Sequence, residues 1–449
     1  MKYYIGILFM IFFVSCNSFL DVKPDQKMTI PKSLKDCDAL LDDYFTMNNN
    51  YPVAGEVGSD HYYLSDVNFD AITIDADRQA YLWDSNADIA TENWRSSYKK
   101  VFNSNQVLEI LDKINPETNR IEYNRIKGEA LFFRAYAYMQ LADIFTLPFD
   151  QATSGQQLGL VLRKTAHVDE VSVRATLKDT YDTILKDLSE SVTLLPENSN
   201  YKTRPTKAAA YAALARVGLV IRDYELVVNA ASKCLLLYDK LIDYNSLSQN
   251  SNAPFPLFNE ETILYATTLT SNCLNPNVAI MDSNLVLSYA QNDLRKQLYF
   301  KTSTNGRFLF KGKYDGQINY GSFAGIATDE VYLTLAEAYV HTQQIATGML
   351  TLNKLLKSRF VRNEYVDLKT NDKQTALALI WRERRKSLIM RNVRWMDIKR
   401  INVIGDTSIT LTRKLKGISY ELKPNDNRYA FLIPSLVVGR VDGISQNIR

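Results

Sequence analysis

Carboxylates and histidines are the residues that could do acid–base or metal chemistry, and their spacing in this 449-residue sequence predicts neither. The pairs Asp42-Asp43 and Glu260-Glu261 are adjacent, whereas the two carboxylates of a glycosidase flank a bond across about 5–10 Å. The segment Asp75-Ala76-Asp77 lacks the glycine and the distal glutamate of a calcium loop. The histidines lie far apart in the sequence and predict no metal site: His61, His167 and His341.

Other catalytic signatures are absent from the sequence. There is no glycine-rich phosphate loop ending in Lys-Ser or Lys-Thr, no Gly-x-Ser-x-Gly elbow for a serine nucleophile, and no His-Glu-x-x-His motif. We therefore expect a protein that is not an enzyme and that uses no cofactor.

The first 25 residues predict export and a lipid anchor. Residues 3–14 form an apolar run after Lys2, which is shorter than the roughly 20 residues of a membrane span and typical of a signal peptide over residues 1–15. Phe13-Val14-Ser15-Cys16 resembles a bacterial lipobox, so we expect Cys16 to become a lipidated N-terminus on a polar tether, residues 16–25. The alternative is a plain cleavage site with an incidental cysteine. Acyl chains contribute about 0.8 kcal/mol per buried methylene, so several of them would anchor the chain to a membrane.

The overall charge gives no reason to expect a nucleic-acid partner. Lys and Arg number 53 against 50 Asp and Glu, a net charge of +3. The basic stretch 381–400 also contains Glu383 and Asp397, and we expect it to end a long helix and to form ion pairs.

The remaining cysteines, Cys37, Cys234 and Cys273, have neither the count nor the spacing of a disulfide framework or a zinc site. Cys37 and Cys234 fall in helical patterns, and we expect them to be small core residues.

Apolar residues recur at steps of three and four through most of the chain, which predicts a mainly α-helical protein. Alanines crowd 206–221, so a neighbouring helix can approach closely. Helical hairpins in series are typical of a tetratricopeptide-like scaffold. The predicted helices cover 92–114, 121–145, 177–195, 206–221, 224–238, 328–342, 344–360 and 372–392.

Long stretches without helical period separate these helices, at 46–91, 240–327 and 402–449. Loops of this length are commonly functional surfaces, although we expect more than half of their length simply to cover the scaffold. We expect an N-terminal part, 26–240, and a C-terminal part, 241–449, in one compact body.

An ordered set of motifs runs nearly from end to end of the chain. It comprises Cys16 to Asp21, Trp94 with Tyr98, Asn105 and Leu108, and the segments 128–136, 158–163, 206–216, 330–338, 383–384, 394–400, 431–434 and 446–447. In this order the motifs resemble those of the SusD/RagB lipoproteins. Ser387, Arg391 and Asn392 depart from the acidic residues and glycine of that family, which indicates a divergent branch whose ligand need not be starch.

The resemblance implies a protein at the outer face of the outer membrane that captures a nutrient and acts as the lid of a SusC-like TonB-dependent barrel transporter. A glycan or oligosaccharide is the expected ligand, and a peptide is the first alternative. A helical-repeat scaffold without a small ligand and a surface glycosidase are the others. We expect Arg134, Arg216, Glu337, Glu383, Arg394 and Asp397 to form ion pairs and helix-end contacts within the scaffold.

A sugar ligand predicts a cleft that combines aromatic rings, which pack on C–H faces, with polar groups that pair with hydroxyls. The sequence contains 27 Tyr, more than its 19 Phe and 4 Trp, which suits such a surface as well as a core. Two loop segments supply the candidate ligand-binding residues: Asp60, His61, Tyr62, Tyr63, Trp83 and Asp84 in the first, and Tyr320 and Phe323 in the second.

Overall fold

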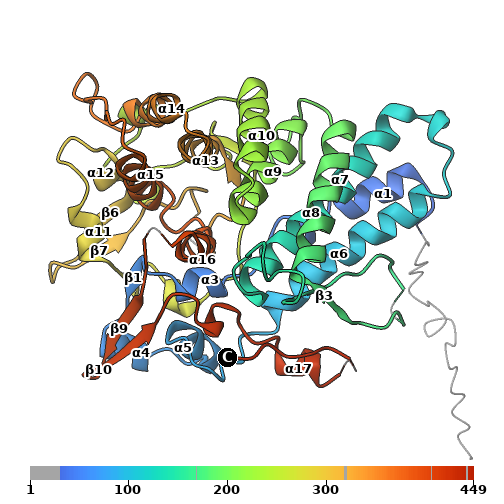
Figure 1. Ribbon diagram of the computed structural model, residues 1–449, viewed down its shortest axis with the longest axis horizontal. Coiled ribbons are helices and arrows are strands. Elements are labelled where there is room, and N and C mark those ends of the chain that lie inside the picture. Colours follow the sequence, from blue (N-terminus) through green and yellow to red (C-terminus); the bar gives the residue numbers. More distant parts are fainter. Residues whose placement is uncertain (1–30, 168, 318–320, 406, 441–442) are drawn as a thin grey trace, which may run out of the picture.

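Helical hairpins form the scaffold of the protein. The computed structural model describes residues 31–167, 169–317, 321–405, 407–440 and 443–449. The predicted signal peptide, Cys16 and the predicted tether therefore lie outside the described residues. Consecutive helices pack in pairs from the N-terminal half into the C-terminal half (Figure 1), which confirms the prediction of a mainly helical protein. These helices are α1 (Leu34–Leu41), α6 (Glu92–Leu111), α7 (Arg120–Phe145), α8 (Leu177–Leu194), α9 (Lys207–Ile221), α10 (Tyr224–Leu237), α13 (Thr328–His341), α14 (Ile345–Lys357), α15 (Lys373–Ser387) and α16 (Arg394–Ile404).

Side-chain caps explain where several of these helices begin. The Asn119 side chain accepts a hydrogen bond from the Glu122 amide at the start of α7, and Thr176 and Thr206 cap α8 and α9 in the same way. Within α9 the alanines are buried, and the helix packs against α8, α10 and α13. The small side chains therefore permit the close approach that the sequence predicts.

The prediction of one helix over 372–392 is wrong at its end. Helix α15 ends at Ser387, and Met390 and Asn392 have φ angles of 57° and 56°, in the left-handed region that a helix cannot contain. The Asn392 amide donates to Glu56 Oε2 at 2.8 Å. This contact with a segment distant in sequence stabilises the turn, after which α16 begins at Arg394. The basic stretch therefore forms a helix, a turn and a second helix.

The stretches without helical period contain short helices and strands. These elements are too short to show a pattern from which they could be predicted. The first of them holds α2 (Tyr44–Met47), α3 (Ala54–Gly58), β1 (Tyr62–Tyr63), α4 (Asp66–Asp70) and α5 (Asp75–Tyr81). The others hold α11 (Ser283–Leu287), α12 (Arg295–Tyr299), α17 (Ser435–Val438) and most of the remaining strands, whereas the strands at Leu158–Val161 and Arg174–Thr176 lie between two long helices. Turns of 3-10 helix lie at Pro116–Thr118, Tyr244–Ser246, Asn272–Leu274 and Asn427–Tyr429.

The described residues form four small antiparallel sheets, two of which join segments that are far apart in the sequence. The largest has the strand order β1-β5-β7-β6, in which Tyr62 pairs with Met281. In the β9–β10 hairpin, Lys416 and Gly417 have φ angles of 49° and 79°, as a two-residue type I′ turn requires. The strands are β2 (Leu158–Val161), β3 (Arg174–Thr176), β4 (Thr262–Leu264), β5 (Ile280–Met281), β6 (Phe300–Thr302), β7 (Phe308–Phe310), β8 (Ile326–Ala327), β9 (Leu411–Leu415) and β10 (Ile418–Leu422).

Buried ion pairs connect the helices, as the sequence predicts. Arg134 pairs with Asp187 between α7 and α8 at 2.7 Å, and Arg384 pairs with Asp397 between α15 and α16 at 2.8 Å. The other predicted residues are also paired: Arg216 with Glu330, Glu337 with Arg400, Glu383 with Arg295, and Arg394 with Asp60. These ion pairs stabilise the scaffold, and each of these charged side chains is paired with another one within it.

The three described cysteines are buried and free, which confirms the core positions of Cys37 and Cys234. Among the described helices, none combines the length and apolarity that crossing a membrane requires.

Candidate ligand-binding site

The first group of predicted ligand residues lies around α3, and most of its side chains already have partners. Both carboxylate oxygens of Asp60 accept hydrogen bonds from Arg394, at 2.7 and 2.8 Å. His61 is buried with Nδ1 at 2.9 Å from Glu56 Oε1, and the buried Tyr62 hydroxyl donates to the Val57 carbonyl. These three side chains serve internal contacts.

Trp83 joins these internally bonded side chains around α3 in one cluster, because its buried indole donates to the carbonyl of Gly58 at 2.9 Å. Arg413 of β9 joins it to Tyr62, since its guanidinium lies 5.0 Å from the Trp83 ring and 5.2 Å from the Tyr62 ring. The exposed members of the group are Tyr63 and Asp84. No motif in the sequence indicates that Arg413 is the centre of this cluster.

The second predicted group is only partly described, since Tyr320 lies outside the described residues. Phe323 is buried, with its ring centroid 5.3 Å from that of Tyr314. Met390 lies between the two groups, because its backbone nitrogen is 3.4 Å from His61 Nδ1 and it lines a small cavity with Phe323. That cavity has a volume of about 10 Å³, which is room for about one water molecule and not for a sugar.

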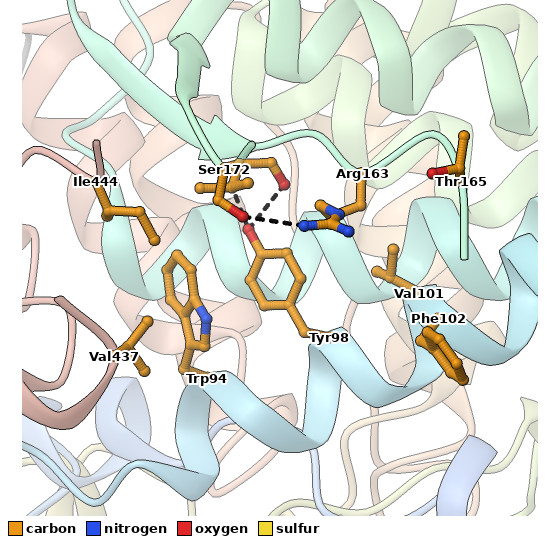
Figure 2. Close-up of a pocket in the computed structure, with 10 residues that line it drawn as sticks. Trp94, Tyr98, Val101, Phe102, Arg163, Thr165, Ser172, Val437 and Ile444 are labelled. Atoms are coloured by element: carbon orange, nitrogen blue, oxygen red, sulfur yellow. Dashed lines mark hydrogen bonds between the residues drawn. The ribbon is translucent and has the colours of Figure 1, made fainter. Parts of the chain in front are cut away.

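A larger hollow of about 230 Å³ lies beside α6, between this helix, β2 and the C-terminal segment (Figure 2). Residues three and four apart on α6 share one face of the helix, and here that face turns toward β2. The lining residues are Trp94, Tyr98, Val101, Phe102, Val161, Arg163, Thr165, Ser172, Val437 and Ile444.

Aromatic rings dominate one side of this hollow. The ring centroids of Trp94 and Tyr98 are 4.5 Å apart, and Trp94 packs edge-on against Phe145 at 5.1 Å. The Tyr98 hydroxyl donates to the Val161 carbonyl and accepts from the Val161 amide, at 2.9 and 3.1 Å. Burial raises the pKa of the Tyr98 hydroxyl well above its ordinary value, so the ring stays neutral. The two bonds to β2 fix the orientation of the aromatic surface.

Polar groups occupy the edge of the hollow. Arg163 donates through Nη1 to Ser172 Oγ at 3.0 Å and to the Glu170 carbonyl at 2.9 Å, and it also bonds the His167 carbonyl (Figure 2). Its own backbone amide donates to the Tyr138 hydroxyl at 2.8 Å. The guanidinium is therefore held at the rim, where it can meet a hydroxyl of a bound molecule.

The arrangement places aromatic rings and a guanidinium around one space, which suits the binding of a ligand. No cluster of three His, Cys, Asp or Glu side chains suited to a metal ion occurs within the described ranges. In the sequence, Trp94 and Tyr98 belong to a motif of a scaffold helix, and their spacing does not indicate a binding site. Their covering residues, Val437 and Ile444, are more than 300 positions away, and no local signal predicts that contact.

Comparisons with known proteins agree with this fold. A family model described as "Starch-binding associating with outer membrane" matches residues 18–219, and the model of the SusD family matches residues 261–447. SusD-like protein P2 of Formosa agariphila is 25% identical over 139 residues, which are 31% of this chain and 25% of that protein. The alignment thus spans about a quarter of that relative.

Solved structures share the fold over nearly the whole chain. A SusD superfamily protein from Bacteroides thetaiotaomicron aligns with a TM-score of 0.75 at 19% identity, over 93% of this chain and 100% of the other. A SusD-like carbohydrate binding protein from Bacteroides vulgatus aligns with a TM-score of 0.69 at 18% identity, over 92% and 97%. Together the two family models cover most of the chain, which belongs to the SusD/RagB family of non-catalytic binding proteins.

Proposed function

We propose that the protein is a cell-surface lipoprotein that captures a nutrient glycan and delivers it to a SusC-like TonB-dependent barrel transporter, acting as its lid. The matching family description names starch binding and association with the outer membrane. The observation that carries the ligand class is the aromatic hollow beside α6, where rings and a rim guanidinium face the same space. A sugar has C–H faces that pack on aromatic rings and hydroxyls that can pair with the guanidinium.

The size of the hollow limits what it holds. Pockets for drug-sized ligands measure about 300–1,000 Å³, so a hollow of about 230 Å³ suits a single sugar unit with the rest of the chain outside. Phe102 and Arg163 are the contact residues of choice for a test, because the buried Trp94 is also part of the core.

Binding is tested with a glycan array and a peptide library, followed by calorimetry on the full chain in detergent. We expect a glycan to bind and Phe102→Ala to weaken binding by about tenfold or more, as truncating an aromatic contact residue does. Tyr201→Ala, which removes an exposed aromatic ring from another loop, is the matched control and keeps the affinity. If a peptide binds and no glycan does, the ligand class is a peptide and the proposed glycan ligand is wrong. If neither binds, the alternative of a scaffold without a small ligand is favoured.

The anchor and the transporter are tested separately. Cys16 carries the proposed lipid, so metabolic labelling with an acyl probe marks the intact chain and not Cys16→Ser. A tagged full chain extracted from outer membranes is expected to bring a TonB-dependent barrel with it. Purification without a barrel contradicts the lid role and leaves glycan binding untouched.

A further inference from the structure

A second hollow, of about 330 Å³, lies on the other flank of α6. It is more polar than the aromatic hollow and is formed by α6 together with the segment that includes α2. The residues that line it are Phe45, Thr46, Asn49, Asn50, Glu92, Arg95, Ser96, Lys99 and Lys100.

Lys100 is the unusual member of this second hollow. It is fully buried, and its ammonium donates to the Ser96 carbonyl at 3.2 Å and lies 4.4 Å from the centroid of the Tyr51 ring. Across the described part of the chain, no carboxylate lies within 4.0 Å of Lys100 Nζ. Burying an ammonium without an anionic partner is unfavourable, so an entering anion would be stabilised there.

The nearby carboxylates are committed elsewhere. Asp43 attracts Lys100 at a distance, but its side chain accepts a hydrogen bond from the Thr46 amide at 3.1 Å and caps α2. Glu92 forms an ion pair with Arg95 at 2.6 Å. Lys99 stands at the rim with its ammonium 5.0 Å from the centroid of the Phe102 ring. The hollow therefore has an excess of positive charge.

The rim of this second hollow also contains an aromatic ring, that of Phe45, and a side-chain amide, that of Asn49. Phe45 lines this hollow and is 78% exposed, so its ring is accessible to a bound molecule. An exposed ring offers a face on which the C–H groups of a sugar can pack. Asn49 Oδ1 accepts from the Thr267 hydroxyl at 2.8 Å, which orients the amide beside this ring.

We infer that this second hollow is a subsite for an acidic saccharide, whose carboxylate or sulfate meets Lys99 and Lys100 while its ring packs on Phe45. Arg95 is an exposed side chain that can move aside to admit the anion to Lys100, while the exposed Lys99 contacts the anion at the rim. Charge-assisted hydrogen bonds of this kind are stronger than neutral ones. The inference rests on the proposed glycan-binding function and narrows its ligand class.

The test is calorimetry on the full chain in detergent with three probes: trigalacturonate, its methyl ester, and a sulfated galactan oligomer. We expect at least one of the two acidic probes to bind, and trigalacturonate, if it binds, to do so about tenfold more tightly than its uncharged ester. Lys99→Gln and Lys100→Met should each abolish the preference for the charged probe. Lys186→Gln, which removes an exposed lysine from α8, is the matched control and should keep it.

The outcomes separate this inference from the proposed function. If neither acidic probe binds, or if the preference survives in both lysine variants, the acidic subsite is wrong. If a neutral glycan nevertheless binds and Phe102→Ala weakens it, the proposed function stands without the subsite. Lysine-selective NMR gives a second readout, because an anion that reaches the site should shift the Lys100 side-chain resonance and not that of Lys186.

Discussion

Arg394 donates to both carboxylate oxygens of Asp60, at 2.7 and 2.8 Å, across 334 positions of sequence. Arg385 lies on the same carboxylate at 3.1 Å. The pairing joins the start of α16 to the segment between α3 and β1. This charge-assisted ion pair therefore connects the N-terminal half of the chain to the C-terminal half.

Replacing Asp60 by Asn should destabilise the protein by about 2 kcal/mol at pH 7, because the neutral amide is a poorer acceptor for two guanidinium groups. Burial by itself raises the pKa of the Asp60 carboxyl, but the charges of Arg394 and Arg385 outweigh it and hold the pKa well below its ordinary range. The stability that the carboxylate contributes is thus fully present at neutral pH and is lost as the pH falls below about 4.

Urea unfolding of wild type and Asp60→Asn at pH 7 and pH 3 checks this prediction. The difference in the free energy of unfolding should shrink on acidification. Asp182→Asn is the matched control, because Asp182 pairs with Lys178 at a site where both side chains are about half exposed. A constant difference at the two pH values would rule out the proposed role of the Asp60 charge.

The buried pair of Arg216 and Glu330 connects α9 to α13 through two hydrogen bonds of 2.7 and 2.6 Å. Arg216→Met should cost about 3–5 kcal/mol, since Glu330 would remain buried without its ion-pair partner, with Arg384 at 3.9 Å and the charge of Arg391 farther away. The double variant Arg216→Met with Glu330→Leu should recover part of this loss, because no charge is then left unpaired. Chemical denaturation of the three proteins measures the coupling, and a double variant less stable than Arg216→Met would contradict it.

Gly159 in β2 connects scaffold stability to the aromatic hollow. A Cβ atom at this position would overlap the Thr176 carbonyl and the Thr180 hydroxyl, while Gly155, a few residues earlier, has open space around it. Gly159→Ala should therefore destabilise the fold by about 1–3 kcal/mol and displace β2, which contributes Val161 to the hollow. Gly155→Ala should match wild type in thermal unfolding and in glycan affinity. Equal behaviour of the two variants would be evidence against this close packing.

The long helices could be predicted from the sequence because each is long enough to show its own period, and several of them also carry a side-chain cap. The expected helix 121–145 is observed as Arg120–Phe145, and Asn119 caps it. The hairpin of β9 and β10 was not predicted, because its strands are short and its turn rests on two residues, Lys416 and Gly417.

The sites were harder to predict because their geometry depends on contacts between distant segments. Asp60 has the sequence context of a polar loop residue, and nothing near it in the sequence indicates that Arg394 pairs with its carboxylate. Trp94 and Tyr98 showed helical spacing, but spacing does not reveal that Val437 and Ile444 line the hollow next to them. The ion pairs were predictable as a class, and their particular partners were not.

Lys100 gives the last prediction, which is the pH dependence of stability. Burial lowers the pKa of its ammonium to about 7, and the charge of Asp43 opposes this only in part. In the unfolded chain a lysine has a pKa of about 10.4, so between pH 7 and pH 10.4 the unfolded state binds more protons and the stability contribution of Lys100 rises with pH. Lys100→Met removes this penalty. It should stabilise the protein by about 1–3 kcal/mol at pH 7, with a gain that fades above pH 10.

Denaturant unfolding of wild type and Lys100→Met between pH 6 and pH 10.5 checks this, with Lys186→Met as the exposed-lysine control. The control should differ from wild type by a constant, small amount across the range, since exposed substitutions have little effect. A Lys100→Met protein that is less stable than wild type at pH 7 would mean that the Ser96 carbonyl and the Tyr51 ring fully compensate the buried charge. In that case the buried Lys100 ammonium would not need an anionic partner, and the result would count against the acidic subsite.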